Sequence, residues 1–464
     1  MSSSATDFLS RLTDVPVANR LAAAIDLMAQ AFPTRTAIVE QAGSDQRRTI
    51  AYGLLAANVK AVEQQLAAQR PRGVVARQRE IDALVATVAA CGRQQVPLAV
   101  VADDSRDLVG ALQNWAVLDD GLQLSAGPTG IGSHAEHRRE EAFDPASAQV
   151  VVATSGTSGP PKLVEHSWDS LLAAARLSEQ WHGLSWLLVY DATRWAGTQV
   201  WLQALLTAGT LVVPASRAPD CVARAIVEED VSILPATPTL LRRLLTSAES
   251  GLLSKMKLER ITLGGEATDA QLLAKTQAAF PGVKVTHVYA TTELGEVFRV
   301  TDGRAGFPVE WLGKTLPGGV RLTTRRDGEL LVQLSRDTAE VATGDLVERR
   351  NDRCEFTGRR SDVIVVGGAK VYPRRVEDIL RGVSGIADAR VYGLPSAITG
   401  ELVAAQIVLA DPLPTEATPE SIRAAALTTC RTALEPHSTP RLLDFVKHLM
   451  VNTSGKIPRH ASRL

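Results

Sequence analysis

The sequence predicts an α/β protein with a large N-terminal domain of mostly parallel sheets covered by helices, followed by a small α+β domain. Two observations favour this fold class. Short apolar segments with strand character alternate with helical patterns through the first two thirds of the chain. After about Leu330, strand-like segments cluster between charged turns, and two helical patterns follow. We therefore expect two domains, 1–358 and 359–464.

Apolar residues at helical or strand spacing place the individual elements. In the N-terminal part, helices are predicted over 52–68, 81–90, 171–180 and 200–207, and strands over 97–101, 149–153, 187–190 and 210–213. Later in the chain, strands are predicted over 284–288, 329–333, 355–357 and 363–366, and helices over 375–381 and 419–434. Short apolar strands between helices indicate parallel sheets that are covered on both faces.

The composition is typical of a globular enzyme and argues against a nucleic-acid or membrane protein. The 464 residues are 45% hydrophobic and 22% charged. Because the formal net charge is only -1, no overall attraction draws the chain to nucleic acid or to an anionic membrane. The most apolar stretch, 200–214, is too short to span a bilayer and is interrupted by Gln203 and Gly209.

The cysteines indicate a reducing compartment. Cys91, Cys221, Cys354 and Cys430 lie far apart, without a Cys-x-x-Cys pair and without a histidine spacing that suggests zinc. The first residues lack the basic start and apolar run of a signal peptide. We expect a cytoplasmic protein with free thiols.

The segment from Thr154 to Lys162 has the character of a phosphate-binding loop. The residues concerned are Thr154, Ser155, Gly156, Thr157, Ser158, Gly159 and Lys162. Glycines let backbone N–H groups approach an anion, and hydroxyls and a lysine add donors and positive charge. A Walker A loop is excluded, because Pro161 precedes the lysine and Leu163 follows it. Taken alone, the segment is also compatible with a Ser/Gly-rich surface turn.

An aromatic residue and two carboxylates follow later strands. Tyr289 comes after the strand predicted at 284–288 and is followed by Thr292 and Glu293. An aromatic ring there can stack on a purine, and a glutamate can hold Mg²⁺ beside phosphates. Asp345 lies at a Thr-Gly-Asp turn, where a carboxylate can accept hydrogen bonds from two ribose hydroxyls. Each segment alone is also compatible with a helix cap or a plain turn.

The C-terminal part adds a guanidinium, a glycine turn and a lysine. Arg359 follows Gly358, and Gly367-Gly368 offers a backbone that a ligand can approach closely. Lys456 lies on a tight Ser-Gly-Lys turn near the end of the sequence. The joint occurrence of these segments in this order is far more specific than any one of them.

The order and residues of these motifs resemble the adenylate-forming superfamily, which comprises acyl-CoA synthetases, peptide-synthetase adenylation domains and luciferases. The resemblance extends from about Ala37 to Arg459 and is nearest in style to compact acyl- and aryl-CoA ligases. The phosphate loop is similar to the signature Ser-Gly-Thr-Thr/Ser-Gly-x-Pro-Lys, and the segment from Tyr289 to Glu293 is similar to Tyr-Gly-x-Thr-Glu.

The resemblance implies roles for the matching nucleotide-binding residues. Tyr289 is expected to stack on adenine, Thr292 to contact a phosphate and Glu293 to hold Mg²⁺. Asp345 and Arg359 are expected to bind the ribose.

The remaining matches concern the adenine edge and the C-terminal domain. The resemblance implies that the turn containing Gly265 and Glu266 borders the adenine. It also implies that Lys456 contacts the carboxylate and the α-phosphate during adenylation. In this family the small domain moves between two half-reactions, first delivering the lysine and then a wall of the thiol tunnel, here the Gly367-Gly368 turn.

Four positions depart from the family pattern. Ser361 stands at the hinge position, Ala290 and Leu163 replace glycines, and Met450 replaces the proline before the C-terminal lysine loop. None of these changes removes a group with a chemical role. A hinge tolerates a small residue, so the domain motion is expected to persist, and Ser361 bears only on the equilibrium between its two states.

The acid pocket is less well defined by the sequence. Arg194 and Trp195 stand where many acyl-CoA synthetases have His-x-x-Gly, so Arg194 is expected to pair with a polar group of the substrate or with a structural carboxylate. Trp195 and His287 are candidates for the pocket wall. Asp191 resembles the aspartate of peptide synthetases that holds a substrate ammonium, and a helix-capping role is the alternative.

The resemblance implies two half-reactions with ATP and Mg²⁺. A carboxylate forms an acyl adenylate and releases pyrophosphate, and a thiol, most simply that of CoA, then displaces AMP. The alternatives are a carrier-protein phosphopantetheine as acceptor, another nucleophile or an oxyanion such as nitrite, and a silent nucleotide sensor. A sensor needs no catalytic lysine, so Lys456 argues against that last reading.

Overall fold

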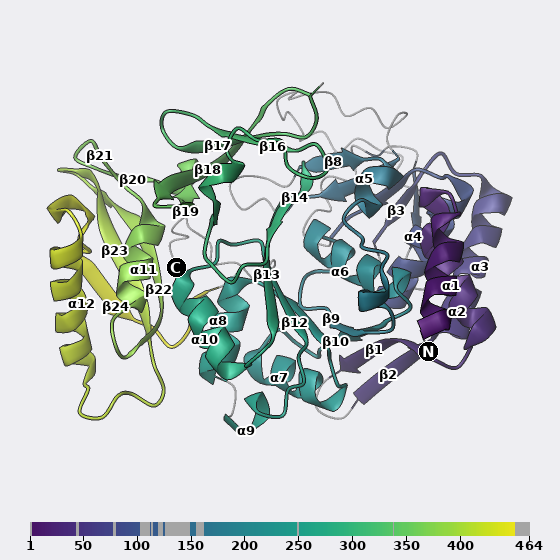
Figure 1. The fold of residues 1–464 in the computed structure, drawn as a ribbon, viewed down its shortest axis with the longest axis horizontal. Helices are drawn as coiled ribbons and strands as arrows, with labels where there is room; N and C mark the ends of the chain where they lie inside the picture. Colours follow the sequence, from purple (N-terminus) through teal and green to yellow (C-terminus); the bar gives the residue numbers. More distant parts are fainter. Residues whose placement is uncertain are drawn as a thin grey trace. The chain divides into compact units, whose positions relative to one another are not determined.

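The computed structural model describes residues 2–42, 46–77, 80–102, 112, 115–118, 124–125, 149–154, 162–247, 250–336 and 338–450. Figure 1 shows the helices and strands in the order of the chain, which divides into two compact units. The first comprises Met1–Pro235, Lys255–Ile261 and Ala290–Glu296, and the second comprises Ala236–Ser254, Thr262–Tyr289 and Val297–Leu464. Thr292 and Glu293 therefore belong to the same unit as Thr154 and Lys162.

One sheet of the first unit holds the strands that flank the predicted phosphate loop. Its strands are β3 Val74–Ala76, β4 Leu98–Val100, β5 Ala116–Leu118, β6 Leu124–Ser125, β7 Val150–Ala153 and β8 Leu163–His166. The order is β6-β5-β3-β4-β7-β8, parallel from β5 to β7 and antiparallel at both edges. Strands β3, β4 and β7 are wholly buried, as expected for a covered sheet.

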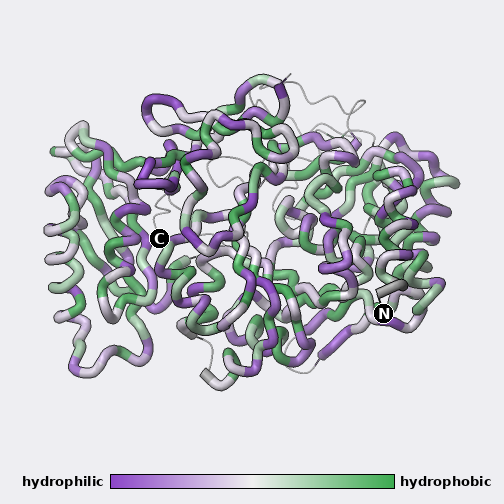
Figure 2. Tube along the Cα trace, viewed as in Figure 1, coloured by the Kyte–Doolittle hydropathy of each residue, from purple (hydrophilic) through white to green (hydrophobic). Residues whose placement is uncertain are grey.

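Other strands of the first unit lie side by side in the order β11-β9-β10-β1-β2. Their bounds are β1 Thr36–Ala42, β2 Gln46–Ala51, β9 Ser185–Leu187, β10 Thr210–Val213 and β11 Ile233–Ala236. All pairs are parallel except β1 with β2. The exposed half of β2 is hydrophilic, which Figure 2 shows in purple.

Apolar helices cover these strands. The helices are α1 Ser2–Thr13, α2 Arg20–Ala31, α3 Tyr52–Gln69, α4 Ile81–Gln94, α5 Trp168–Leu172, α6 Trp195–Leu206 and α7 Pro219–Glu228, with the 3-10 turns η1 Val17–Asn19 and η3 Glu179–Trp181. Every residue from Ile81 to Gly92 is buried, so α4 lies inside the core. Trp201 of α6 and Tyr52 of α3 are among the largest fully buried side chains.

The helix predicted over 171–180 is wrong. The structure has the short helix α5, which ends at Leu172, and the 3-10 turn η3. The physical reason is that the backbone N–H and carbonyl of Arg176 are both hydrogen-bonded to one side chain. The Gln203 side chain accepts a hydrogen bond from the Arg176 N–H (2.7 Å) and donates one to the Arg176 carbonyl (3.1 Å). These groups would otherwise pair within a helix.

The second unit contains helices α8 Pro238–Ser247, α9 Ser250–Leu253 and α10 Ala270–Ala279. Strands β12 Arg260–Gly264, β13 Lys284–Thr291 and β14 Gly295–Val300 are neighbours in the order β14-β13-β12. An antiparallel five-stranded sheet follows, in the order β15-β19-β18-β17-β16, together with the turns η4 Val309–Trp311 and η5 Arg360–Asp362. Its bounds are β15 Phe307–Pro308, β16 Arg321–Thr324, β17 Glu329–Gln333, β18 Val341–Arg350 and β19 Arg353–Arg359.

The C-terminal part of this unit is an α+β module. Its elements are β20 Ile364–Val366, β21 Ala369–Val371, α11 Pro373–Arg381, β22 Ile386–Ser396, β23 Gly400–Leu409, α12 Pro419–Ala433, η6 Pro436–Ser438 and β24 Leu442–Phe445. The strand order is β21-β20-β23-β22, and β24 pairs with β23. Its own hydrophobic core includes Val376, Leu380 and Ile422.

Buried charges connect this module to α8 and α10. Asp269, the N-cap of α10, pairs with Arg242 of α8 (2.5 Å). Asp388 of β22 lies 2.8 Å from Arg381 of α11 and 3.6 Å from Arg242. The Gln271 side chain donates to the Arg381 carbonyl (3.0 Å). Arg242 of α8 therefore pairs with an aspartate of α10, and Arg381 of α11 pairs with an aspartate of β22.

Three of the four cysteines are fully covered. Cys91, Cys354 and Cys430 are buried, and Cys221 is partly exposed. Burial raises the pKa of the Cys91 thiol far above its usual range and that of Cys430 to about 11.

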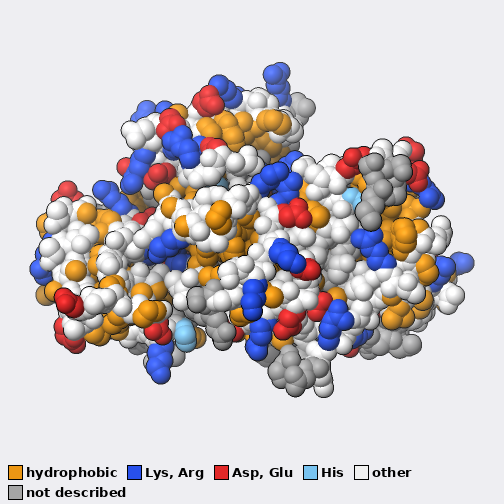
Figure 3. Space-filling view, turned by 60° about the horizontal axis from the view of Figure 1, so that its bottom comes forward, with side chains coloured by type: hydrophobic (Ala, Val, Ile, Leu, Met, Phe, Trp, Pro, Cys, Tyr) orange, Lys and Arg blue, Asp and Glu red, His pale blue; other side chains and the backbone are white. Residues whose placement is uncertain are grey.

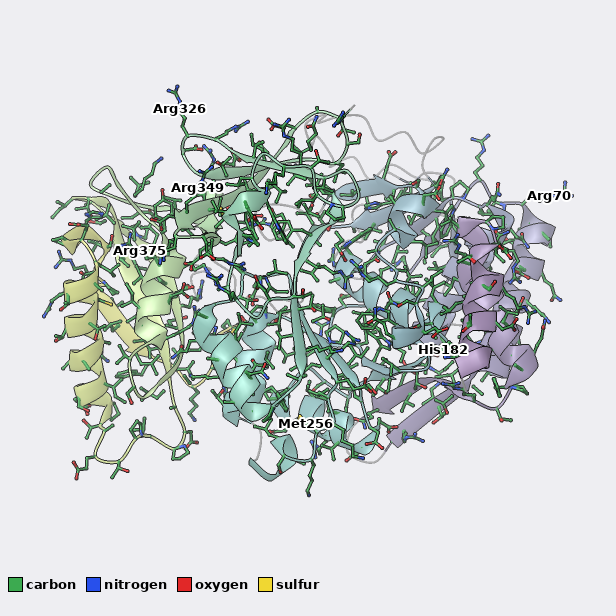
Figure 4. The ribbon with its side chains drawn as sticks, in the orientation of Figure 1. Arg70, His182, Met256, Arg326, Arg349 and Arg375 are labelled. Atoms are coloured by element: carbon green, nitrogen blue, oxygen red, sulfur yellow. The ribbon has the colours of Figure 1, made fainter. Side chains whose placement is uncertain are left out.

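The surface shows no segregation of charge on the face that Figure 3 presents, where basic and acidic side chains are interspersed. Arg326 and Arg349 extend outward from the five-stranded sheet (Figure 4). Among the described residues, no helix combines the length and the apolar character that crossing a membrane would require. The described residues also hold no group of three or more His, Cys, Asp or Glu side chains suited to a metal ion.

The predicted fold class is confirmed, because parallel sheets covered by helices precede an α+β module. The boundary predicted after residue 358 falls within the second unit and stays a prediction.

Candidate active site

The base of the predicted phosphate loop is closed by two hydrogen bonds. The Thr154 N–H donates to the Lys162 carbonyl (2.8 Å), and the Lys162 N–H donates to the Thr154 hydroxyl (2.9 Å). These bonds continue the antiparallel β7–β8 ladder, in which Ala153 pairs with Leu163. The predicted loop residues Ser155, Gly156, Thr157, Ser158 and Gly159 lie outside the described residues.

Arg194 is directed at the end of strand β7. Its Nη1 donates to the Ala153 carbonyl (3.1 Å) and to the Thr154 carbonyl, and only 7% of the residue is exposed. Arg194 is also the N-cap of α6, so its backbone is fixed by the start of that helix. The contacts are with backbone carbonyls at the loop base, which sequence reasoning did not foresee.

Trp195 stacks on a histidine that the motifs did not reveal. The rings of Trp195 and His166 lie 4.4 Å apart at 26°. Burial lowers the pKa of His166, while the Thr292 backbone and the Glu293 charge act in the opposite direction. Strand periodicity is the signal that could have found this residue. Lys162, Val164 and His166 are spaced two apart, so in an extended segment they lie on the same face.

Thr292 and Glu293 form the turn of the hairpin between β13 and β14. The Leu294 N–H donates to the Thr291 hydroxyl (3.0 Å), and Gly295 has a φ of 69°, which a side-chain-bearing residue rarely adopts. The ring of Trp195 lies directly beside Gly295, at 3.3 Å from the position of an added Cβ. Glu293 is exposed, so its carboxylate is available to a ligand.

Asp191 is held in a local turn. Its Oδ1 accepts hydrogen bonds from the Thr193 N–H (2.9 Å) and the Thr193 hydroxyl (2.6 Å). Burial lowers the pKa of Arg217, and the nearby Asp191 charge partly offsets this effect. These contacts form a local turn before α6, and since Arg194 is the N-cap, the Asp191 side chain does not cap that helix. The ammonium-binding role of Asp191 stays a prediction.

Tyr289, Asp345 and Arg359 form a hydrogen-bonded cluster in the second unit. The Tyr289 hydroxyl donates to Asp345 Oδ2 (2.6 Å), and the Arg359 Nε donates to Asp345 Oδ1 (3.0 Å). Asp345 faces Arg359 across the β18–β19 ladder, and the Thr343 hydroxyl accepts from its N–H (3.1 Å). The Asp345 charge raises the pKa of Arg359, and burial raises that of Tyr289. The structure thus brings together three residues predicted at the nucleoside.

The Tyr289 ring is part of an aromatic cluster. It lies 5.1 Å from Phe298 at 22° and 5.1 Å from Phe356 at 24°. The cluster continues through Phe307 and Trp311. This packing fixes the plane of the tyrosine ring, and stacking on adenine stays a prediction.

The other predicted residues of this unit are positioned by the backbone. Glu266 Oε2 accepts from the Thr239 N–H (3.0 Å), and the preceding Gly265 has a φ of 81°. His287 Nε2 lies 2.9 Å from the Arg304 carbonyl, and its place in the wall of the acid pocket stays a prediction. Burial lowers the pKa of His287.

The glycine turn of the C-terminal module adopts the conformation that its sequence predicts. Gly367 and Gly368 have φ values of 58° and 85°, and the Gly367 N–H donates to the Thr399 carbonyl (2.8 Å). The turn therefore rests against the β22–β23 hairpin. The predicted catalytic Lys456 lies outside the described residues.

Two family models match the chain in succession. The AMP-binding enzyme model covers residues 30–332, and the AMP-binding enzyme C-terminal domain covers residues 375–456. The chain belongs to the adenylate-forming AMP-binding enzymes. The predicted family is confirmed.

Relatives of this adenylate-forming chain are distant. It is 25% identical over 362 residues to a medium/long-chain-fatty-acid–[acyl-carrier-protein] ligase of Mycobacterium tuberculosis, covering 67% of this chain and 65% of that protein. It is 27% identical over 351 residues to a 2-succinylbenzoate–CoA ligase of Bacillus pumilus, covering 69% and 70% of the two chains. The alignment thus spans less than two thirds of the first relative's length.

Two solved structures share the fold of this chain. The amide bond synthetase McbA of Marinactinospora thermotolerans matches with a TM-score of 0.69 at 21% identity, over 95% of this chain and 98% of that one. The o-succinylbenzoate CoA synthetase of Bacillus subtilis, in complex with an acyl adenylate, matches with a TM-score of 0.64 at 20% identity, over 94% and 96%.

Proposed function

We propose that this protein activates a carboxylic acid with ATP as an acyl adenylate and then transfers the acyl group to a thiol, most directly that of CoA. The observation that carries the proposal is the Tyr289–Asp345–Arg359 cluster in a chain of this family. Asp345 is largely buried, and its carboxylate accepts hydrogen bonds from a hydroxyl and from a guanidinium. Such a carboxylate is a suitable acceptor for the two ribose hydroxyls of a nucleoside. The cluster therefore supports the nucleotide roles assigned to all three residues.

In the first half-reaction, an oxygen of the acid attacks the α-phosphorus of ATP, and the bond to the pyrophosphate oxygen breaks. No protein nucleophile is needed, so catalysis rests on positioning and on offsetting charge. We assign this to the loop based on Thr154 and Lys162, to Thr292, and to Lys456 beside the α-phosphate. One such donor is typically worth about 10²–10³ in rate.

Glu293 fits a magnesium ion bound together with ATP. Mg²⁺ usually takes one or two carboxylates, and phosphate oxygens and waters complete its coordination. An exposed glutamate on a hairpin turn satisfies this requirement without a preformed cage of acidic residues. When bound, the ion supplies neutralisation of the phosphate charge.

A cavity of about 320 Å³ in the C-terminal module supports a phosphate-bearing acceptor. Three basic side chains line it, together with the single carboxylate of Glu435, hydroxyl groups and an apolar wall. These basic residues are Lys370, Arg375 and His437. CoA and carrier-protein phosphopantetheine both carry phosphate, so the cavity suits either one. Arg375 is labelled on α11 in Figure 4.

The compartment and the domain boundary complete the proposal. We assign the enzyme to the cytoplasm, since all four of its cysteines are free thiols. Residues 359–464 are proposed to move as the small domain, with Ser361 at the hinge.

Carboxylate-dependent exchange of ATP with labelled pyrophosphate tests the first half-reaction. The panel contains medium- and long-chain fatty acids, aromatic acids and amino acids. Exchange with one class establishes adenylation, and silence across the panel with intact ATP binding would reject it. The acceptor is then identified by supplying the active acid with CoA, dephospho-CoA or a phosphopantetheinylated carrier protein.

A further inference from the structure

The segment Arg194-Trp195 contacts both strands that flank the phosphate loop. Arg194 donates to the carbonyls of Ala153 and Thr154 at the end of β7. The next residue, Trp195, stacks on His166 at the end of β8. Because β7 and β8 are the two strands of one hairpin, consecutive residues at the start of α6 hold both of them.

This segment is itself rigidly held. The Arg194 N–H donates to the Asp191 carbonyl (3.1 Å), and the Ala192 carbonyl accepts from the Thr198 hydroxyl (3.1 Å) and the Trp201 indole (3.0 Å). A Cβ at Gly197 would lie only 2.0 Å from the Asp191 carbonyl oxygen, so only glycine permits this close approach. The backbone that presents Arg194 and Trp195 therefore has little freedom.

We infer that Arg194 is a positioning residue for the ATP phosphates and not a ligand of the acid. Its guanidinium is bonded to the two carbonyls that lead into the loop, and its buried positive charge lies at the loop base. Trp195 completes this brace by holding the second strand through His166. The inference rests on the proposed function, because it assigns the effect of Arg194 to the nucleotide half of the adenylation site.

The two assignments of Arg194 predict different kinetic effects. A positioning residue acts on every acid alike, because in the proposed function the loop binds the phosphates of ATP. Its loss is expected to lower kcat and to raise the KM for ATP. A displacement of about 1 Å at a reacting phosphate can cost about 10²-fold. A ligand of the acid instead raises the KM for those acids that carry the matching polar group.

The experiment compares Arg194→Met and Arg194→Lys in the full-length enzyme. Pyrophosphate exchange is measured with two acids that differ in a second polar group, and the Kd for Mg·ATP is measured without acid. For Arg194→Met we expect about a 10²-fold loss of kcat/KM for ATP with both acids, while the KM for each acid stays within about threefold. Lysine retains one charged donor but not the planar fork, so partial rescue is expected. Arg47→Met, which removes an exposed arginine that pairs with Glu229 in the same unit, is the matched control and should leave all constants unchanged.

Two further measurements separate the brace from folding and from the proposed function. Hydrogen exchange should accelerate in the peptide that contains β7 in Arg194→Lys and in the peptide that contains β8 in His166→Ala, and His166→Phe, which retains a stacking ring, should restore protection of β8. This readout needs no turnover, so it tests the brace even if no acid proves active. The inference is overturned if β7 protection is unchanged in Arg194→Lys, or if the KM for one acid class rises tenfold or more while Mg·ATP binding is intact.

Discussion

Replacing Asp269 by asparagine tests whether the buried ion pairs stabilise the second unit. Asparagine keeps the acceptor for the Leu272 N–H (2.8 Å), because it is a preferred N-cap residue. It removes the charge that faces Arg242, whose side chain is only 5% exposed. Burial by itself raises the pKa of Asp269, but the Arg242 charge and the Leu272 hydrogen bond outweigh it and lower the pKa from 3.8 to about 2. At about 1.4 kcal/mol for each unit, this difference corresponds to roughly 2–3 kcal/mol.

The pH dependence follows from the direction of this shift. Since the folded-state pKa lies below the unfolded-state value, the ionised carboxylate stabilises the fold above pH 3.8, and the contribution is lost as the pH falls towards 2. Asp269→Asn is therefore expected to lower the free energy of unfolding by about 2–3 kcal/mol at pH 7 and by progressively less below pH 4.

Native-state hydrogen exchange of α10 at increasing urea measures this loss within the second unit. Glu310→Gln serves as the control, because its ion pair with Lys314 of the same unit is about two thirds exposed, and a change below roughly 0.5 kcal/mol is expected. Unchanged α10 protection at pH 7, or a loss of the same size at pH 7 and near pH 2, would refute the argument.

Four further changes test the proposed function. Lys456→Ala is expected to abolish pyrophosphate exchange while sparing thioester formation from supplied acyl adenylate, and survival of both half-reactions would reject its catalytic role. Asp345→Asn is expected to raise the Kd for ATP by about 10- to 100-fold, because a charge-assisted acceptor of ribose hydroxyls is lost; an unchanged Kd by calorimetry would exclude Asp345 from the nucleoside site. Tyr289→Phe keeps the ring and removes only the hydroxyl bonded to Asp345, so a smaller loss of about 1 kcal/mol is expected by the same measurement. Arg375→Ala is expected to raise the KM for CoA severalfold, and an equal effect with dephospho-CoA would argue against a contact with its 3′-phosphate.

Local patterns predicted those elements whose ends are marked by local signals. Strands β10 at Thr210–Val213 and β17 at Glu329–Gln333 have the predicted bounds, because turn residues bracket each apolar run. Helix α12 ends within one residue of its prediction. The helix predicted at 171–180 failed because its backbone is bonded to a side chain of α6, and this tertiary contact has no trace in the local pattern.

The residues of the candidate site were also predictable only where their contacts are local in the sequence. Asp345 and Arg359 were predicted to act together, and they are cross-strand partners in a hairpin, a local relationship. Arg194 was predicted near the substrate, but its hydrogen-bond partners lie some forty residues earlier in the chain. His166 belongs to no motif, and its proximity to Trp195 depends on how α6 packs on the sheet. Side-chain direction across such distances follows from packing, which spacing in the sequence does not encode.

The buried cysteines have a consequence for the reaction proposed here. An acyl adenylate is an electrophile, and the thiolate form of any cysteine within reach can attack it. Cys91, Cys354 and Cys430 are covered, and burial raises the pKa of each thiol, so all three stay protonated at neutral pH. Three of the four cysteine thiols are therefore poor nucleophiles towards the acyl adenylate, so the activated acyl group is available to the external acceptor.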